Sequence, residues 1–307
     1  MKIGLVGAPV QSGASQPGCI MGPDAFRTAG LARALESLGH DVVDFGNTQP
    51  AQINGRKASN PSVRNLDETV GWAMALEDEA HNACNSADVP IFLGGDHSLS
   101  IGTVPGVTRY SKDRKREQFV LWLDAHPDFH SLNSTHSGNL HGTPMAYFTG
   151  QEGFKDVYPE LDVSVPLENV CMMGIRSVDQ FEKQALSHRR VDVHDMRTLD
   201  ENGVVKPLTQ FLDRVREADG ALHVSLDVDF LEPSIAPAVG TTVPGGATFR
   251  EAHLIMEILH DSGLVTSLDL VELNPFLHDR GRTANPMVDL CASLFGRTVL
   301  DRPTKSN

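Results

Sequence analysis

The chain lacks the features that mark nucleic-acid-binding and membrane-spanning proteins. Its 307 residues carry 26 Lys and Arg against 40 Asp and Glu, which gives a formal net charge of −14. Nucleic acid is not an expected partner, because a phosphate backbone demands a basic surface, whereas a cationic ligand suits this charge. The sequence has no apolar run of about 18 residues, and its short N-terminal apolar run ends too early for a signal peptide or membrane span. We expect a cytoplasmic protein.

Cysteine is also scarce, and its distribution argues against a disulfide framework. The four cysteines, Cys19, Cys84, Cys171 and Cys291, lie far apart and form no CxxC pair. Such scattered residues are typical of reduced thiols that serve as small packing residues in a cytosolic protein.

The apolar segments predict a three-layer α/β/α fold with a central, mostly parallel sheet. Several of these segments are almost continuously apolar, as is typical of strands that helices cover on both faces. Strands are expected at 2–7, 41–46, 89–95, 119–125, 169–175, 222–229 and 265–273, with a weaker one near 191–195. Helices are expected over 22–39 and 249–263, and surface loops over about 47–66 and much of 127–144. Because linkers and repeats are lacking, we expect a single domain over residues 1–307.

Acidic residues follow four of the expected strands. The segments are GGDH (94–97), LDAHPDFH (123–130), SLDVDF (225–230) and VELNP (271–275). An aspartate after a strand is most often only a helix cap or a turn residue. In an open parallel sheet, however, the ligand crevice lies at the carboxyl ends of the strands. Together, the four segments predict one acidic cleft.

The residue types in this cleft predict a pair of divalent cations. Four aspartates and two histidines in close proximity would repel one another and lose hydration without a compensating positive charge. Because residues two apart on a strand share a face, Asp124, His126 and Asp128 are expected to face Asp227 and Asp229 of a neighbouring strand. Six such ligands exceed the needs of one zinc ion and suit Mn²⁺, with two aspartates bridging ions roughly 3.5–4 Å apart. Co²⁺, Ni²⁺, Zn²⁺ and Fe²⁺ remain open.

Five segments resemble the motif regions of the arginases, in the ureohydrolase family. They are GGDHSLSIGT (94–103), DAHPDFH (124–130), SGNLHG (137–142), SLDVDFLEPSIAPAVGTTVPGG (225–246) and LDLVELNP (268–275). The resemblance spans nearly the whole chain in the expected order. It implies a parallel sheet of about eight strands, two Mn²⁺ per subunit, hydrolysis of L-arginine to L-ornithine and urea, and a homotrimer or homohexamer.

The resemblance also assigns the metal ligands. It implies that one ion is bound by His97, Asp124, Asp128 and Asp227, and the other by Asp124, His126, Asp227 and Asp229. A hydroxide held between the two ions would be the nucleophile, because coordination lowers the pKa of water to about 7. Asp128 would also accept a hydrogen bond from this hydroxide and steer it.

Two further residues receive catalytic roles from the resemblance. Glu272 matches the carboxylate that binds the guanidinium group by a two-point contact. His141 matches the proton shuttle, which would protonate the leaving amine. The alternatives are a strand-end ion pair for Glu272 and an accessory loop histidine for His141.

The remaining matches concern substrate recognition. Ser137 and Asn139 correspond to residues that hold the substrate α-carboxylate, and Asp179, assisted by Glu182, to the acid that receives the α-amino group. Thr241 resembles a threonine on the guanidinium side.

Two residues depart from the family pattern in this region. His130 stands where many arginases carry an asparagine that contacts the carboxylate, and Ser177 stands where an aspartate is common. Both departures bear on how the α-carboxylate and the α-amino group would be recognised.

Two other functions remain open at this point. One is a related amidinohydrolase that acts on agmatine, guanidinobutyrate or another guanidino acid. SGNLHG favours arginine, because agmatine has no carboxylate for these polar groups to bind. The other is a binding or regulatory protein without catalysis, which predicts lost ligands, whereas all six ligand positions are filled.

Overall fold

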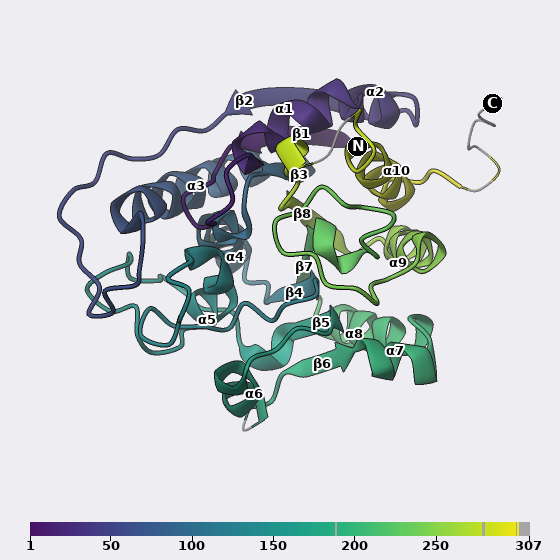
Figure 1. The fold of residues 1–307 in the computed structure, drawn as a ribbon. Helices are drawn as coiled ribbons and strands as arrows, with labels where there is room; N and C mark the ends of the chain where they lie inside the picture. The colour runs from purple at the N-terminus through teal and green to yellow at the C-terminus, as the bar shows by residue number, and fades with distance from the viewer. Residues whose placement is uncertain (188, 278–279, 299, 301–307) are drawn as a thin grey trace.

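The computed structural model describes residues 1–187, 189–277, 280–298 and 300, and its centre is an eight-stranded sheet (Figure 1). The strands lie in the order β2-β1-β3-β8-β7-β4-β5-β6, and the pairings between neighbours are parallel. Their bounds are β1 Lys2–Ala8, β2 Asp41–Asn47, β3 Val89–Gly94, β4 Gln118–Leu123, β5 Val170–Ile175, β6 Asp192–Asp195, β7 Ala221–Asp227 and β8 Val265–Val271. The predicted fold class is confirmed, and each expected strand region forms a strand.

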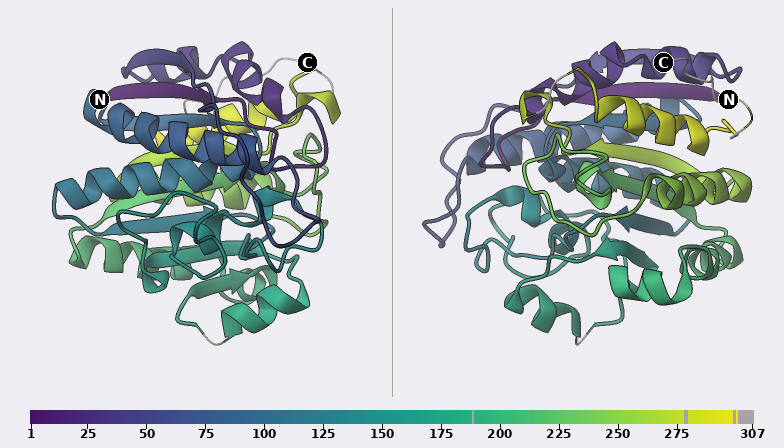
Figure 2. Two further views of the ribbon diagram at one scale, coloured as in Figure 1. Left: turned by 90° about the vertical axis from the view of Figure 1, so that its left-hand side faces the viewer. Right: turned by 45° about the vertical axis from the view of Figure 1, so that its right-hand side comes forward.

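Helices cover both faces of the sheet (Figure 2). One layer contains α3 (Leu66–Ser86), α4 (Ser100–Asp113), α5 (Pro144–Phe148) and α6 (Gln180–Ser187). The other contains α1 (Gly22–Thr28), α2 (Leu31–Glu36), α7 (Met196–Asn202), α8 (Val205–Glu217), α9 (Phe249–Ser262) and α10 (Ala284–Leu294). Two hydrophobic cores therefore lie on opposite faces of one sheet.

Strand β4 shows why the strand sequences are almost continuously apolar. Phe119, Leu121 and Leu123 pack into the core beneath α8 and α9, whereas Val120 and Trp122 pack into the core beneath α4 and α5. Because successive side chains point to opposite faces, a strand buried on both sides needs an apolar residue at every position.

The segment 22–39 differs from its prediction as a single helix. It forms α1 and α2, and Gly30 lies between them with a left-handed φ of +86°. An L-residue with a side chain would be strained in that conformation, whereas glycine adopts it readily. The apolar spacing on both sides of Gly30 concealed this break.

Helix α9, in contrast, closely matches its prediction. It is Phe249–Ser262, and its start is stabilised by a capping box in which Thr248 and Glu251 exchange side-chain-to-backbone hydrogen bonds. Within the described residues no helix is both long and apolar enough to cross a bilayer. The four cysteines are buried free thiols.

Candidate metal centre and catalytic cleft

The acidic residues named from the sequence converge at the carboxyl ends of four adjacent strands. Strands β3, β8, β7 and β4 are neighbours in the sheet, and the loops that follow them surround a cavity of about 230 Å³. The lining residues are His97, Asp124, His126, Asp128, His130, His141, Gly142, Ser177, Asp179, Glu182, Asp227, Asp229, Thr241 and Glu272. The expected cleft at the strand ends is therefore present.

The local geometry differs from the predicted alternation along strands. Strand β4 ends at Leu123, so Asp124, His126 and Asp128 lie in the following loop, and Asp128 has a left-handed φ of +48°. Asp227 is the last residue of β7, but Asp229 lies in the short 3₁₀ helix η5 (Val228–Phe230). The alternation of side chains along a strand was thus the wrong reason for the convergence of these residues.

Hydrogen bonds to the backbone hold the two loops together instead. The N–H of Asp229 donates to Asp227 Oδ1 at 2.7 Å, and the N–H of Ala125 donates to Asp229 Oδ1 at 3.0 Å. Each carboxylate therefore uses one oxygen to fix the backbone and turns the other towards the cleft.

Three carboxylate oxygens surround one nitrogen of His97. The distances from His97 Nδ1 are 3.0 Å to Asp124 Oδ2, 3.0 Å to Asp227 Oδ2 and 3.2 Å to Asp128 Oδ2. The four residues expected at the first ion are therefore together.

A second cluster adjoins the first and shares Asp124 with it. His126 Nδ1 lies 3.0 Å from Asp229 Oδ2 and 3.6 Å from Asp124 Oδ1. Asp124, His126 and Asp229 have mutually close ligand atoms, which places three of the four residues expected at the second ion. Asp227, expected as the second bridging ligand, groups with His97 rather than with His126.

The electrostatics of both clusters fit bound cations. Within the described part of the chain, His97 Nδ1 and Asp124 Oδ2 are buried and have no hydrogen-bond partner, although they lie 3.0 Å apart. Burial, and then the neighbouring carboxylates, raise the pKa of Asp227 and raise that of Asp229 to about 6. Divalent cations would supply the positive charge that these buried acids need to remain ionised.

Sequence reasoning missed the residue that orients His97. The Oγ of Ser225 lies 2.8 Å from His97 Nε2, and the imidazole stacks on Trp122 with ring centroids 4.0 Å apart. In this arrangement the imidazole proton lies on Nε2, which donates it to Ser225. Nδ1 then keeps its lone pair, and this lone pair is directed at the carboxylates. The available signal was that Ser225 lies two residues before Asp227 on the same strand.

Glu272 lies beside the first cluster in a strained backbone conformation, with φ at +64°. Its Oε1 accepts the backbone N–H of His97 at 2.8 Å and lies 2.8 Å from His141 Nδ1, whereas Oε2 accepts from the Sγ of Cys19 at 3.9 Å. Burial opposes both charges, but the pairing raises the pKa of His141 to about 9 and lowers the pKa of Glu272. The pair therefore places a protonated imidazole against Oε1 of a buried carboxylate that lines the cavity.

Asp96 is a second residue that sequence reasoning missed. Its buried carboxylate accepts the N–H groups of Gly13, Ala14 and Ser98 at 2.9, 3.0 and 3.0 Å. The carbonyl of Gly13 in turn accepts the N–H of His141 at 3.2 Å. Asp96 thus connects the loop of His97 to the loop of His141. Its place directly before His97 was the signal.

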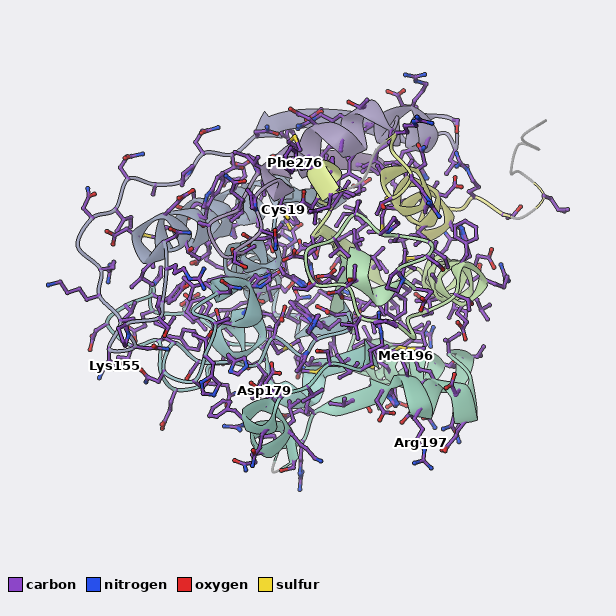
Figure 3. The ribbon with its side chains drawn as sticks, in the orientation of Figure 1. Cys19, Lys155, Asp179, Met196, Arg197 and Phe276 are labelled. Carbon is purple, nitrogen blue, oxygen red and sulfur yellow. The ribbon has the colours of Figure 1, made fainter. Side chains whose placement is uncertain are left out.

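The mouth of the cavity carries a third group of titratable residues. His130 Nε2 lies 3.0 Å from Asp179 Oδ2, and Asp179 precedes α6 (Figure 3). Glu182 accepts the N–H of Phe129 at 3.1 Å, and Thr241 donates to Asp229 Oδ2 at 3.0 Å. Of the expected substrate-binding residues, these four line the cavity.

Ser137 and Asn139 lie outside that lining. Ser137 is exposed, and its Oγ accepts the N–H of Asn139 at 3.2 Å. The side-chain amide of Asn139 lies 3.4 Å from the Oγ of Ser15. The two residues therefore form part of the loop surface beyond the cavity in this conformation.

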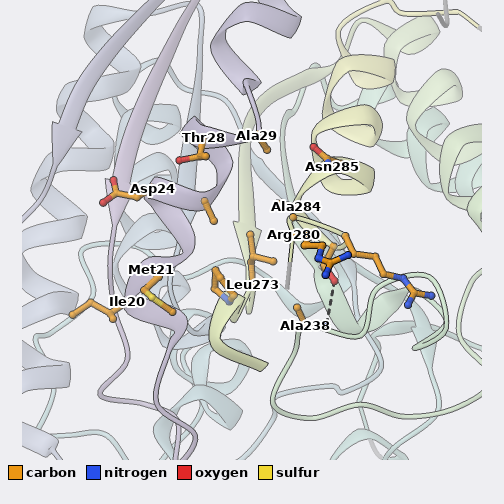
Figure 4. Close-up of a pocket in the computed structure, with 15 residues that line it drawn as sticks. Ile20, Met21, Asp24, Thr28, Ala29, Ala238, Leu273, Arg280, Ala284 and Asn285 are labelled. Carbon is orange, nitrogen blue, oxygen red and sulfur yellow. Dashed lines mark hydrogen bonds between the residues drawn. The ribbon is translucent and has the colours of Figure 1, made fainter. Parts of the chain in front are cut away.

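A larger cavity, of about 760 Å³, lies between the N-terminal segment around residues 20–29 and the start of α10 (Figure 4). Its lining is mainly aliphatic, with residues such as Ile20, Met21 and Leu273, and its charged groups are Asp24, Arg280 and Arg282. It contains no part of the two histidine–aspartate clusters. The larger of the two cavities is therefore not the candidate site. The histidines and aspartates of the smaller cavity identify the candidate site instead.

Comparison with known proteins agrees with the geometry. The sequence model of the Arginase family matches residues 1–296. The arginase of Agrobacterium fabrum is 62% identical, and the match covers 98% of this chain and 92% of that protein.

Two solved structures extend the comparison to the fold. The arginase of Bacillus caldovelox superposes with a TM-score of 0.87 at 33% identity, over 97% of this chain and 99% of that one. An Entamoeba histolytica arginase in complex with L-ornithine gives a TM-score of 0.85 at 25% identity, over 96% and 99% of the two chains.

Proposed function

The chain belongs to the arginase family and hydrolyses L-arginine to L-ornithine and urea, and we propose that it does so with two manganese ions in the acidic cleft. The observation that carries this proposal is the pair of clusters around His97 and His126, which share Asp124. The ligands proposed are His97, Asp124, His126, Asp128, Asp227 and Asp229.

The donor set supports manganese as the bound metal. Four carboxylates and two imidazoles suit a hard octahedral ion better than a tetrahedral zinc ion. When bound, the two cations would supply a nucleophile at neutral pH by lowering the pKa of water from 15.7 to about 7. Asp128, on the cleft side of the first cluster, would orient that nucleophile by accepting a hydrogen bond from it.

The side chains around the metal centre would bind the guanidinium group and move its protons. Oε2 of Glu272 would accept from the guanidinium, because Oε1 is already held by the His97 backbone and by His141. His141 turns Nδ1 to Glu272, so its Nε2 is the nitrogen that would protonate the leaving amine. With its pKa raised to about 9, His141 carries this proton at neutral pH.

The substrate's amino-acid end would extend to the mouth of the cavity. Asp179 and Glu182 would receive the α-amino group there, with Thr241 on the guanidinium side and His130 beside Asp179. Ser137 and Asn139, which lie outside the present lining, would reach the α-carboxylate after a movement of their loop.

The proposal also includes the domain organisation, the oligomeric state and the cellular location of the protein. We expect one catalytic domain over residues 1–307, a homotrimer or homohexamer, and a cytoplasmic location. The assembly rests on the family resemblance alone, and light scattering of the purified protein would measure it.

A substrate panel with parallel metal analysis tests the reaction and the metal. Purified protein reconstituted with Mn²⁺ is expected to bind two ions per chain and to release urea from L-arginine. Agmatine and guanidinobutyrate are expected to give less than about a hundredth of that urea, because agmatine lacks the α-carboxylate, and guanidinobutyrate lacks the α-amino group and one carbon of the chain. A higher rate with either compound would contradict the proposed recognition, and one ion per chain would contradict the proposed metal centre.

A further inference from the structure

A second kind of metal-ligand group lies at the edge of the sheet, away from the cleft. Cys171 on β5 and Asp192 and His194 on the edge strand β6 have ligand atoms that all lie within 4.8 Å of one another. The strand register explains this grouping, because Cys171 pairs with Asp192, and His194 lies two residues further along on the same face. Strand β6 then leads into α7 at Met196 (Figure 3).

The imidazole of His194 lies close to Asp192 without a well-directed hydrogen bond. Both of its ring nitrogens are buried and have no hydrogen-bond partner among the described residues, although Nε2 lies 2.9 Å from Asp192 Oδ1. The other carboxylate oxygen of Asp192 accepts from Arg214 Nη2 at 2.8 Å, so Oδ1 is the oxygen that faces the imidazole.

A similar close approach of an imidazole to a carboxylate occurs at the candidate metal centre. There, His97 Nδ1 and Asp124 Oδ2 lie 3.0 Å apart, and both are buried without a hydrogen-bond partner in the described structure. His223 Nε2 also approaches Asp269 Oδ2, at 3.3 Å, but no third ligand atom joins that pair in the described structure. The group at the sheet edge therefore shares both features with the metal centre, the close approach and the third ligand.

From this geometry we propose that Cys171, Asp192 and His194 form a binding site for a thiophilic divalent cation such as Zn²⁺. One thiolate, one imidazole and one carboxylate are three of the four ligands of a tetrahedral zinc ion, and water would be the fourth. Binding would release the thiol proton of Cys171 to solvent as the metal–sulfur bond forms.

The two centres would select different metals. The sulfur ligand favours Zn²⁺ over Mn²⁺ at the sheet edge, whereas the carboxylates of the cleft favour Mn²⁺. Burial, and then Asp192, raise the pKa of the Cys171 thiol, so a bound cation would be needed to stabilise its thiolate. Asp192 and His194 are partly exposed at the edge strand, and this exposure gives an ion a route to the buried sulfur.

Cadmium spectroscopy on the manganese-loaded protein tests the site directly. Cd²⁺ bound by a thiolate gives an ultraviolet charge-transfer band that oxygen and nitrogen ligands do not give. We expect a band that saturates at one Cd²⁺ per chain and disappears when Zn²⁺ is added. Failure of the wild-type protein to give this band would overturn the proposal.

Matched cysteine variants identify the sulfur involved. Cys171→Ser is expected to abolish the band, whereas Cys291→Ser, which changes a thiol in the same hydrophobic core, is expected to keep it. Cys19→Ser is also expected to keep it, which excludes the thiol near Glu272. If the band persists in Cys171→Ser, the proposal is wrong.

Two variants that retain the thiol guard against a folding defect in Cys171→Ser. His194→Gln and Asp192→Asn are each expected to weaken Cd²⁺ binding at least about tenfold, with manganese content and urea release unchanged. Unaltered affinity in both variants would contradict the proposed ligand set. Zn²⁺ is also expected to raise the Tm of the wild-type protein, but not of Cys171→Ser, by about 2 °C.

Discussion

The base and the mouth of the acidic cleft are built differently, and under the proposed function this difference would separate metal binding from substrate selection. At the base, Asp124, Asp227 and His97 are almost fully buried. The two aspartates accept backbone N–H groups of their own loops, and His97 contacts Ser225 of β7. At the mouth, His130 is partly buried and Asp179 is exposed, and the two come from separate loops. A site whose chemistry is anchored by a sheet can change its specificity through loops without losing its reaction.

The largest expected effect comes from Asp124, because it joins the two clusters at the base. Asp124→Asn removes a negative charge that faces both His97 and His126. We expect metal content to fall below one ion per chain and kcat to fall about 10³-fold, since the cations contribute several kcal/mol to the reaction. Elemental analysis and a urea assay measure the two effects.

Asp162→Asn is the control for this variant, because it changes an exposed carboxylate that pairs with Lys112. Two retained ions in Asp124→Asn would show that the clusters do not share this ligand. The two clusters at the base of the cleft would then bind their ions more independently than their geometry indicates.

A variant of His141 tests whether catalysis in the cleft can be lost while metal binding is retained. His141→Asn is expected to lower kcat about 10²-fold while both ions are retained, because it removes a proton donor but no ligand. The wild-type rate should also fall as pH rises through about 9, where His141 loses its proton, and this limb should be absent from the variant. Full activity in the variant at neutral pH would exclude His141 from proton transfer.

A variant of Ser225 tests whether the ligand side chains at the base of the cleft are oriented by residues that do not themselves bind metal. Ser225→Ala removes the partner of His97 Nε2, so we expect an affinity loss of about tenfold for one ion and a smaller change for the other. Ser267→Ala is the matched control, because it changes a buried serine of the neighbouring strand that contacts His223 instead. Equal metal affinities in the two variants would contradict an orienting role.

The sequence predicted the base of the cleft better than its mouth. The apolar strands and the acids that follow them are local signals, so β3, β4, β7 and β8 and the cleft at their ends were accessible without a structure. The contacts of Ser225 and Asp96 join distant segments. Their positions beside Asp227 and His97 were a local signal that these residues lie near the cleft, but not of the contacts that they make. The break at Gly30 was hidden because apolar spacing continues across it, and the exposed position of Ser137 depends on how a long loop packs.

His130 should produce the smallest effect, and it tests the mouth alone. Its Nε2 lies 3.0 Å from Asp179 Oδ2, so the imidazole competes with a substrate amino group for that oxygen. A partly exposed pair of this kind contributes up to about 1 kcal/mol, so His130→Asn should lower the KM for L-arginine about two- to fivefold. With δ-guanidinovalerate, which is arginine without its α-amino group, the KM should not change. A similar decrease for both substrates would mean that His130 restricts access to the whole cavity, and a change in metal content would mean that the mouth and the base are not separable.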